Sequence, residues 1–286
     1  MKRALILTGG GPASSAWELG LITGMAGAGL DVRDADLVVG TSSGSRVALH
    51  LASDVPHDVA LQQRLRPGPP STERPAAVDW VQLRKDLTAA RTSGGSKADI
   101  LRRVGALALA AASGSTGESR RAIVAPQLPT QTWPEQRVLI PCVSAETGER
   151  RVFDRESGID LVDAVIATTA SFGMPLTLFE DEHYFDGGYY SSDNADLALG
   201  FDRVLILSLV RPPGVPFEPL VSREDSVARL QDGGSLVEVI VPDDNTSAAF
   251  AAAGGLMNPS ISATAATAGR VQGASIVNER LLSFWR

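Results

Sequence analysis

The sequence predicts an α/β fold that begins with a parallel βαβ unit, and three observations support this. Short, mostly apolar runs at residues 4–7, 35–39 and 203–209 are typical of buried strands. Segments of helical character at residues 16–22 and 45–51 follow the first two runs. Glycine-rich turns join each of these two strands to its helix. A strand, a helix and a second strand in this order form a parallel crossover unit.

The rest of the chain continues the alternation of strands and helices. Residues 137–144 and 150–153 are predicted to form an antiparallel β-ribbon. Residues 236–241 are predicted to add a further strand to the sheet. Residues 271–285 are predicted to form a closing helix, with Trp285 in the core rather than on a ligand-binding surface.

A Gly-x-Ser-x-Gly pentapeptide at residues 40–44 lies where the second strand passes into a helix. At such a junction the pentapeptide forms a nucleophile elbow, a tight turn that lifts the Oγ atom of Ser42 clear of the backbone. Gly40 and Gly44 avoid side chains that would crowd this turn against the adjoining strand and helix. The alternative interpretation is an ordinary turn, rich in serine and glycine, at the start of a helix.

A run of glycines, Gly9, Gly10 and Gly11, follows the first strand and precedes the first helix. Backbone N–H groups are free there and lie at the positive end of a helix, which suits an anion. The dinucleotide pattern fails because Ser14 replaces its last glycine, and a phosphate-binding loop fails because no lysine follows. The remaining interpretation is an oxyanion hole, with Gly10, Gly11 and Ser43 as candidate backbone donors.

The third feature is the triplet Asp186, Gly187 and Gly188, which follows a predicted strand ending at residues 183–185. The two glycines let the chain reverse close to another backbone and leave the carboxylate at the strand tip. Alone, the triplet is typical of a hairpin turn. Beside the other two turns, it supplies the base that a serine nucleophile needs.

In order and spacing, these three turns resemble those of the patatin-like phospholipases. The similarity extends over nearly the whole chain and includes residues 145–149 before the Asp-Gly-Gly triplet and residues 194–198 after it. It implies a three-layer patatin-like α/β fold, with a mostly parallel central sheet and helices on both faces. It also implies a lipid acyl hydrolase with a Ser–Asp dyad, in which Ser42 is the nucleophile and Asp186 the base.

Because the motifs belong to one site, we predict a single domain over residues 1–286, with residues 56–135 as a helical insertion or cap region. Within it, Ser96 begins a capping-box pattern, and apolar residues recur at helical spacing across residues 96–112. This segment is either an amphipathic helix packed on the body of the protein or a mobile cap over the elbow. Glycine-rich flanks, one of them at residues 113–117, favour the second interpretation.

Three departures from the family pattern concern the site. Residues 12–15 lack the basic residue that many relatives carry after the glycine run, which removes electrostatic help from an arginine but leaves the backbone donors. Ser43 stands where alanine is usual, and its side chain is small. Phe172 stands where relatives have a proline, a position from which it can reshape the acyl pocket.

The three histidines allow a Ser–His–Asp triad to be considered case by case. His50 lies on the helix after Ser42, about 12 Å away at about 1.5 Å per residue, which is too far for a hydrogen bond. His57 is predicted on an exposed loop. His183 is the serious rival, because α/β-hydrolases place their histidine late in the chain. However, residues three apart on a strand point to opposite faces, so His183 and Asp186 cannot easily aim at one serine.

An aspartate is a weak base for a serine hydroxyl, since its reference pKa is ~3.9. Desolvation in a closed apolar pocket raises a carboxylate pKa. Each oxyanion donor is worth roughly 3–4 kcal/mol of transition-state stabilisation. We therefore expect activity to fall as pH drops through the pKa of Asp186, without a histidine-like step near neutrality.

Composition limits the partners of the protein. The net charge of −7 and the pI of 5.1 argue against nucleic acid and against electrostatic docking on anionic membranes, so membrane contact is expected to be transient at most. No apolar run approaches the ~20 residues of a membrane span, and no cleavable apolar segment follows the N-terminus, so we expect a cytoplasmic enzyme. Cys142, the single cysteine, precludes an intrachain disulfide and is expected to be buried and inert. We expect neither a metal nor a cofactor.

The leading hypothesis is a serine acyl hydrolase, of phospholipase or esterase type, that cleaves lipid or other carboxylic esters through an acyl-enzyme on Ser42. Acyl transfer, in which an alcohol or amine replaces water, uses the same dyad, and the sequence does not separate the two reactions. The rival from another class is a catalytically silent family member that serves as a binding or regulatory protein.

Overall fold

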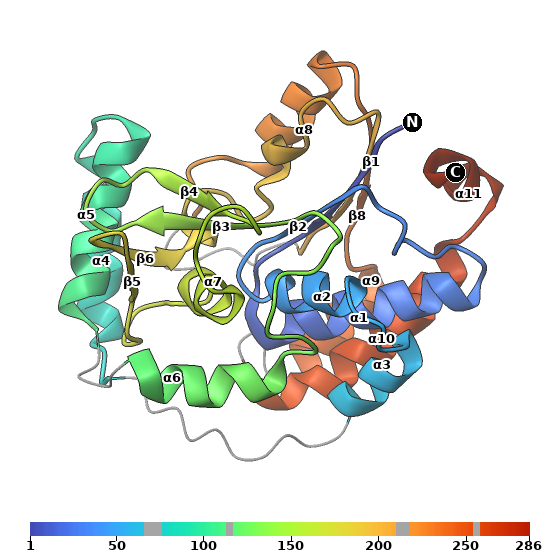
Figure 1. Cartoon of the computed structure of the whole chain (residues 1–286), viewed down its shortest axis with the longest axis horizontal. Coiled ribbons are helices and arrows are strands. Elements are labelled where there is room, and N and C mark those ends of the chain that lie inside the picture. Colours follow the sequence, from blue (N-terminus) through green and yellow to red (C-terminus); the bar gives the residue numbers. More distant parts are fainter. Residues whose placement is uncertain (66–75, 113–116, 210–217, 254–257) are drawn as a thin grey trace.

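The fold is built around a central sheet with helices on both sides (Figure 1). The computed structural model describes residues 1–65, 76–112, 117–209, 218–253 and 258–286. Along the sheet the strands follow the order β5-β6-β3-β2-β1-β7-β8, and β4 pairs with β3 beside that row. The strands are β1 (Arg3–Leu7), β2 (Leu37–Gly40), β3 (Val138–Ser144), β4 (Arg150–Phe153), β5 (Thr177–Phe179), β6 (Glu182–Asp186), β7 (Arg203–Leu207) and β8 (Leu236–Ile240).

The sheet combines a parallel part with an antiparallel end. Strands β3, β2, β1, β7 and β8 run parallel to one another, whereas β4 and β6 are antiparallel to β3, and β5 is antiparallel to β6. The predicted α/β fold class, the parallel unit of β1 and β2 and the ribbon of β3 and β4 are confirmed. Strand β3 joins the two parts, because its start pairs with β2 and its end with β4 and β6.

Helices cover both faces of the sheet, so the central strands are apolar at successive positions rather than alternately. Leu5 and Leu7 of β1 belong to the core that includes α1, α2, α7 and α10, whereas Ala4 and Ile6 belong to the core that includes α8. Helices α4 and α5 cover the end formed by β3 and β6 (Figure 1). The helices are α1 (Gly11–Gly27), α2 (Gly44–Leu51), α3 (His57–Leu65), α4 (Trp80–Thr92), α5 (Lys97–Ala110), α6 (Gly117–Val124), α7 (Leu161–Thr168), α8 (Arg223–Asp232), α9 (Asp244–Ala252), α10 (Ser262–Ile276) and α11 (Glu279–Trp285).

Helices α1 and α10 are in direct backbone contact. A Cβ atom at Gly20 of α1 would lie 2.1 Å from the carbonyl oxygen of Ala266 in α10. A Cβ atom at Gly273 of α10 would lie 2.1 Å from the carbonyl oxygen of Leu21 in α1. Any side chain at these two positions would push the helices apart, so glycine at both positions permits the backbone contact.

The predicted closing helix over residues 271–285 is wrong in its continuity, because the chain forms α10 and α11 instead. The break lies at Val277, whose ψ of 118° is extended. The side chain of Asn278 accepts a hydrogen bond from the backbone N–H of Leu281 and thereby starts a new helix. Trp285 is 1% exposed, so its predicted place in the core is confirmed.

The region predicted as a helical insertion, residues 56–135, contains α3, α4, α5 and α6. Residues 66–75 and residues 113–116, the latter part of one predicted hinge, lie outside the described residues. The organisation of the chain as a single domain over residues 1–286 stays a prediction.

Helix α5 begins with the capping box that the sequence predicts. The backbone N–H of Asp99 donates to Oγ of Ser96 at 3.1 Å, and the N–H of Ser96 donates to Oδ2 of Asp99 at 3.0 Å. Gly105 lies close to the end of β3, since a Cβ there would stand 2.6 Å from the carbonyl oxygen of Ala145. Such packing favours the interpretation of α5 as a helix held on the body, and its motion as a cap stays untested.

Candidate active site

The turn between β2 and α2 places Ser42 in a strained backbone conformation. Ser42 has a φ of 50°, in the left-handed region that non-glycine residues seldom occupy. β2 ends at Gly40 and α2 begins at Gly44, so three residues complete the reversal. A Cβ at Gly44 would stand 2.6 Å from the carbonyl oxygen of Leu7, which is why α2 can start so close to β1. This is the geometry of the predicted elbow.

The side chains of Ser42 and Asp186 meet, although 144 positions separate them in the chain. Asp186 ends β6 and pairs with Cys142 of β3, while β2 lies on the opposite side of β3. The Oγ atom of Ser42 donates a 2.6 Å hydrogen bond to Oδ2 of Asp186. Both residues are partly exposed.

The turn after β6 holds the other carboxylate oxygen. The backbone N–H of Gly188 donates to Oδ1 of Asp186 at 2.8 Å. Gly187 lies against β3, and a Cβ there would stand 2.2 Å from the carbonyl oxygen of Pro141. Of the two glycines in the Asp-Gly-Gly triplet, Gly187 thus permits close contact of two backbones and Gly188 acts as a hydrogen-bond donor.

Thr168 fixes the backbone of Ser42, a contact that sequence reasoning missed. The N–H of Ser42 donates to Oγ1 of Thr168 at 3.0 Å, and that hydroxyl donates to the carbonyl oxygen of Pro141 at 2.7 Å. Thr168 is fully buried at the end of α7. A hydroxyl residue directly after the apolar stretch 164–167 was the signal available in the sequence. The N–H of Ser42 is therefore engaged with the protein itself.

The backbone N–H groups of the glycine loop differ in whether they are already hydrogen-bonded to the protein. The N–H of Gly9 donates to the carbonyl oxygen of Ser192 at 3.0 Å. Among the residues that the structure describes, no hydrogen bond to protein atoms uses the N–H of Gly10, Gly11 or Ser43. Gly11 begins α1, and the first N–H groups of a helix have no partner within it. These three candidate oxyanion donors are thus available, and their catalytic role stays a prediction.

A buried carboxyl group forms a hydrogen bond with the backbone at the start of this glycine loop. Oε1 of Glu18, which is fully buried in α1, accepts a 2.7 Å hydrogen bond from the N–H of Thr8. Burial raises the pKa of Glu18 well above its ordinary value; the bond from Thr8 opposes this, and the charge of Asp193 adds to the rise. The neutral form is therefore favoured. The signal for Glu18 was one acidic residue inside a helix of small and apolar neighbours.

The expectation that His57 lies on an exposed loop is wrong. His57 begins α3, and its side chain is only 10% exposed because it packs beside His50, with ring centroids 6.0 Å apart. His50 is buried, which lowers its pKa to about 4, and the charges of His57 and Arg33 act in the same direction.

His183, the serious rival for a triad, is turned to a different partner. Its Nδ1 atom lies 2.7 Å from Oε1 of Glu146, at the surface of the molecule. The hydroxyl of Ser42 donates to Asp186 directly, without an intervening imidazole. The geometry therefore favours the predicted dyad over a triad.

Two single-residue expectations concern the surroundings of the dyad. Cys142 is fully buried, as expected, and burial followed by the charge of Asp186 raises the pKa of its thiol. Phe172 is also buried, where its ring packs edge-on against Tyr189 with centroids 5.6 Å apart. The influence of Phe172 on an acyl pocket stays a prediction.

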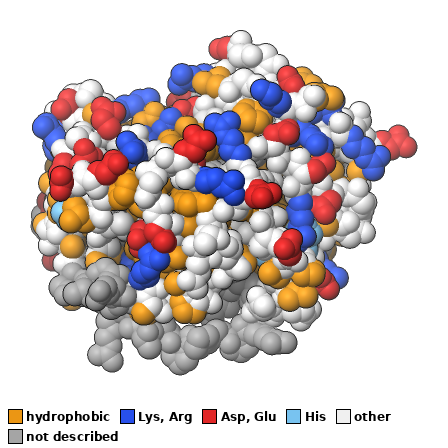
Figure 2. Space-filling view, in the orientation of Figure 1, with side chains coloured by type: hydrophobic (Ala, Val, Ile, Leu, Met, Phe, Trp, Pro, Cys, Tyr) orange, Lys and Arg blue, Asp and Glu red, His pale blue; other side chains and the backbone are white. Residues whose placement is uncertain are grey.

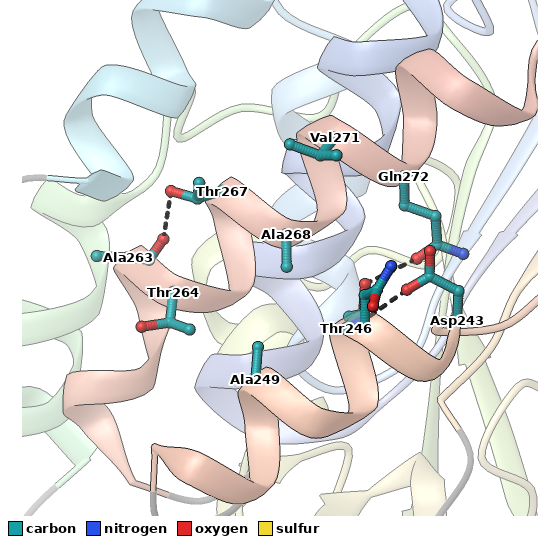
Figure 3. A pocket seen from close by; sticks show the side chains of 10 residues that line it. Asp243, Thr246, Ala249, Ala263, Thr264, Thr267, Ala268, Val271 and Gln272 are labelled. Carbon is teal, nitrogen blue, oxygen red and sulfur yellow. Dashed lines mark hydrogen bonds between the residues drawn. The ribbon is translucent and has the colours of Figure 1, made fainter.

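Two surface hollows are lined by neither Ser42 nor Asp186. One of about 520 Å³ lies between α9 and α10 (Figure 3), and one of about 630 Å³ lies beside Val55 and Pro129. On the face in Figure 2, acidic and basic side chains are interspersed. The described residues contain no cluster of three side chains suited to a metal, and no described helix has the length and hydropathy to cross a membrane.

The fold and site together define an α/β protein with a serine at a strand-to-helix elbow, hydrogen-bonded to an aspartate at the end of β6, which β3 separates from β2 in the sheet. The family model for patatin-like phospholipase matches residues 5–199, and the chain belongs to that family.

Solved structures resemble the chain at low sequence identity. The type III effector protein ExoU is 13% identical, with a TM-score of 0.43, and the match covers 96% of this chain and 52% of ExoU. VipD from Legionella pneumophila is 14% identical, with a TM-score of 0.48, and the match covers 96% of this chain and 66% of VipD. In a complex with SpcU from Pseudomonas aeruginosa, ExoU is matched at 14% identity, with a TM-score of 0.40, over 96% of this chain and 52% of ExoU. The chain thus spans roughly half to two thirds of these proteins. A search of curated protein sequences gave no match.

Proposed function

We propose that this protein is a serine acyl hydrolase that cleaves carboxylic esters of lipids. The single observation that carries the proposal is the 2.6 Å hydrogen bond from Oγ of Ser42 to Oδ2 of Asp186. Membership of the patatin-like phospholipase family supports lipid acyl hydrolase activity in general. The dyad, the acyl-enzyme and the oxyanion donors are our own assignments.

In the proposed first half-reaction, Oγ of Ser42 attacks the ester carbonyl carbon while Asp186 accepts the hydroxyl proton. The negative charge that develops on the carbonyl oxygen faces the backbone N–H groups of Gly10, Gly11 and Ser43. Collapse of the tetrahedral intermediate breaks the carbon–oxygen bond of the ester. The proton passes from Asp186 to the departing alcohol, and the acyl group remains on Ser42.

The second half-reaction repeats these roles with water. Asp186 takes a proton from the water, whose oxygen attacks the acyl carbon. Collapse of the second intermediate releases the carboxylic acid, and the proton returns to Oγ of Ser42. An alcohol or amine in place of water would give acyl transfer from the same intermediate. A cytoplasmic location for the enzyme stays a prediction.

A fluorophosphonate probe tests the proposal, because it reacts covalently with an activated serine. We expect wild-type protein to be labelled and Ser42→Ala to remain unlabelled, with labelled wild type inactive toward a p-nitrophenyl ester. Folded wild type that takes no label would reject the hydrolase and favour a catalytically silent binding protein. Added alcohol that diverts product from acid to ester would favour acyl transfer.

A further inference from the structure

A buried amide side chain contacts both of the segments that carry the dyad. Asn194 is fully buried and adopts a φ of 50° at the start of the short helix η3 (Ala195–Ala198). Its Nδ2 atom donates to the carbonyl oxygen of Ser191 at 2.7 Å and to Oγ1 of Thr41 at 3.1 Å. It also reaches the carbonyl oxygen of Gly187 at 3.4 Å.

These partners belong to the segments that carry the dyad. Thr41 immediately precedes Ser42 in the elbow, and Gly187 immediately follows Asp186. One side-chain nitrogen therefore touches the backbone or side chain next to each reacting group. These contacts join the two segments, because an amide N–H needs an acceptor at about 3 Å.

The orientation of the Asn194 amide is fixed by its opposite end. Oδ1 accepts a 3.1 Å hydrogen bond from the guanidinium of Arg150. That guanidinium forms two 2.7 Å hydrogen bonds with Asp196 and lies over the ring of Tyr190 at 4.4 Å. An arginine only donates hydrogen bonds and a carbonyl only accepts them, so exchanging Oδ1 and Nδ2 would break both sets of contacts.

The same segment also reaches the glycine loop. The carbonyl oxygen of Ser192 accepts hydrogen bonds from the N–H of Gly9 at 3.0 Å and from Oγ1 of Thr8 at 3.1 Å. The stretch from Ser191 to Asn194 thus contacts the elbow, the aspartate turn and the predicted oxyanion loop.

We propose that Asn194 is a positioning residue that sets the approach of Ser42 to Asp186, with Arg150 holding its amide in the required orientation. The proposal rests on the proposed hydrolase function for its kinetic consequences. Its structural content, the dependence of the Ser42–Asp186 distance on the contact between Asn194 and Thr41, is independent of any activity.

Thr41→Val is the sharpest test, because it removes the acceptor for Asn194 while keeping the shape and β-branching of the side chain. Substitution of Asn194 itself is less informative, since a residue without its tolerance for positive φ adds backbone strain. Thr41→Ser restores the hydroxyl and serves as the conservative rescue. We expect Thr41→Val to lower kcat by about ten- to a hundredfold with little change in KM, and Thr41→Ser to recover most of the loss.

Gln272→Leu provides a matched control. Gln272 is a second buried amide that joins separate elements, and it accepts a hydrogen bond from Oγ1 of Thr246 at 3.2 Å (Figure 3). It also accepts from Nε1 of Trp17 at 2.9 Å and donates to the carbonyl oxygen of Val241 at 2.7 Å. None of these partners is a neighbour of the dyad in the chain. Its replacement is expected to lower thermal stability while kcat stays near the wild-type value.

The outcomes separate the positioning role from general destabilisation and from failure of the hydrolase proposal. Loss of kcat in Thr41→Val but not in Gln272→Leu supports positioning, and equal losses at equal stability overturn it. If wild type neither hydrolyses esters nor takes the fluorophosphonate label, the proposed hydrolase function is rejected. Crystal structures of wild type and Thr41→Val then test the positioning role of Asn194. A Ser42–Asp186 separation beyond hydrogen-bond reach in Thr41→Val supports the inference; an unchanged separation overturns it.

Discussion

The backbone N–H of Gly188 binds one carboxylate oxygen of Asp186 while Ser42 binds the other. With Oδ1 held at 2.8 Å by a fixed backbone donor, Oδ2 is turned toward the serine hydroxyl. The carboxylate therefore has little freedom to rotate away from the proton that it is proposed to accept.

Replacing Asp186 with Asn tests this assignment at constant shape. An amide has no basic oxygen of comparable strength, so we expect kcat to fall by about 10²–10⁴-fold. Steady-state hydrolysis of a p-nitrophenyl ester measures the loss. His183→Ala is the control, because His183 pairs with Glu146 instead of the dyad. If His183→Ala abolished activity and Asp186→Asn did not, the base would have been assigned to the wrong residue.

Thr168→Val is predicted to destabilise the protein. It leaves the N–H of Ser42 and the carbonyl oxygen of Pro141 without their shared hydroxyl partner. An unpaired buried polar group costs about 1–3 kcal/mol in the free energy of unfolding, which urea denaturation measures. Thr168→Ser keeps the hydroxyl and should lie close to wild type. Equal stability of the valine and serine variants would contradict the role of that hydroxyl.

His50 makes the stability depend on pH. Its pKa is lowered from 6.5 to about 4 in the folded protein, so the unfolded chain binds a proton first as pH falls. Stability is therefore expected to decline from about pH 6.5 toward pH 4, by about 2 kcal/mol between pH 7 and pH 5.

His50→Leu should remove this part of the decline, as urea denaturation of both proteins at the two pH values would measure. His57, whose pKa is also lowered, adds a decline of the same sign that both proteins share. Parallel stability profiles for wild type and variant would refute the prediction.

Glu18 gives a pH dependence of the opposite sign. Its pKa is raised in the folded protein, so the stability that its neutral form supplies is present below its ordinary pKa of 4.5 and is lost as pH rises toward the raised value. Glu18→Gln keeps an oxygen for the N–H of Thr8 and cannot ionise. Its unfolding free energy should therefore equal or exceed that of wild type in alkaline buffer.

The matched variant for this prediction is Glu18→Leu, which leaves the N–H of Thr8 unpaired. We expect it to be less stable than Glu18→Gln by about 1–3 kcal/mol at every pH. If the glutamine variant were as unstable as the leucine variant, the hydrogen bond to Thr8 would not be the function of the side chain.

The parts of the site that sequence reasoning located share one property: their chemistry is local. A tight elbow or a close backbone contact demands glycine at fixed spacing around Ser42 and Asp186, so the pattern is visible without knowledge of the fold. The start of helix α5 was equally predictable, because the capping box at Ser96 spans only four consecutive residues.

The parts of the site that were not predicted from the sequence depend on contacts between distant segments. Thr168 and Asn194 act on Ser42 and Thr41 across more than a hundred positions, and a buried threonine or asparagine carries no local mark of its partner. The break at Val277 is different in kind. The capping residue Asn278 was visible in the sequence, but the helical spacing of apolar residues on either side concealed it.

The contact between α1 and α10 has a consequence for how the folded chain is assembled. The family match covers residues 5–199, yet the helix that carries the glycine loop rests on a partner formed by Ser262–Ile276. A nascent chain on the ribosome would expose the glycine-lined side of α1 until that distant partner had emerged. Truncation upstream of α10 would therefore leave the packing face of α1 uncovered while keeping Ser42 and Asp186 in the chain.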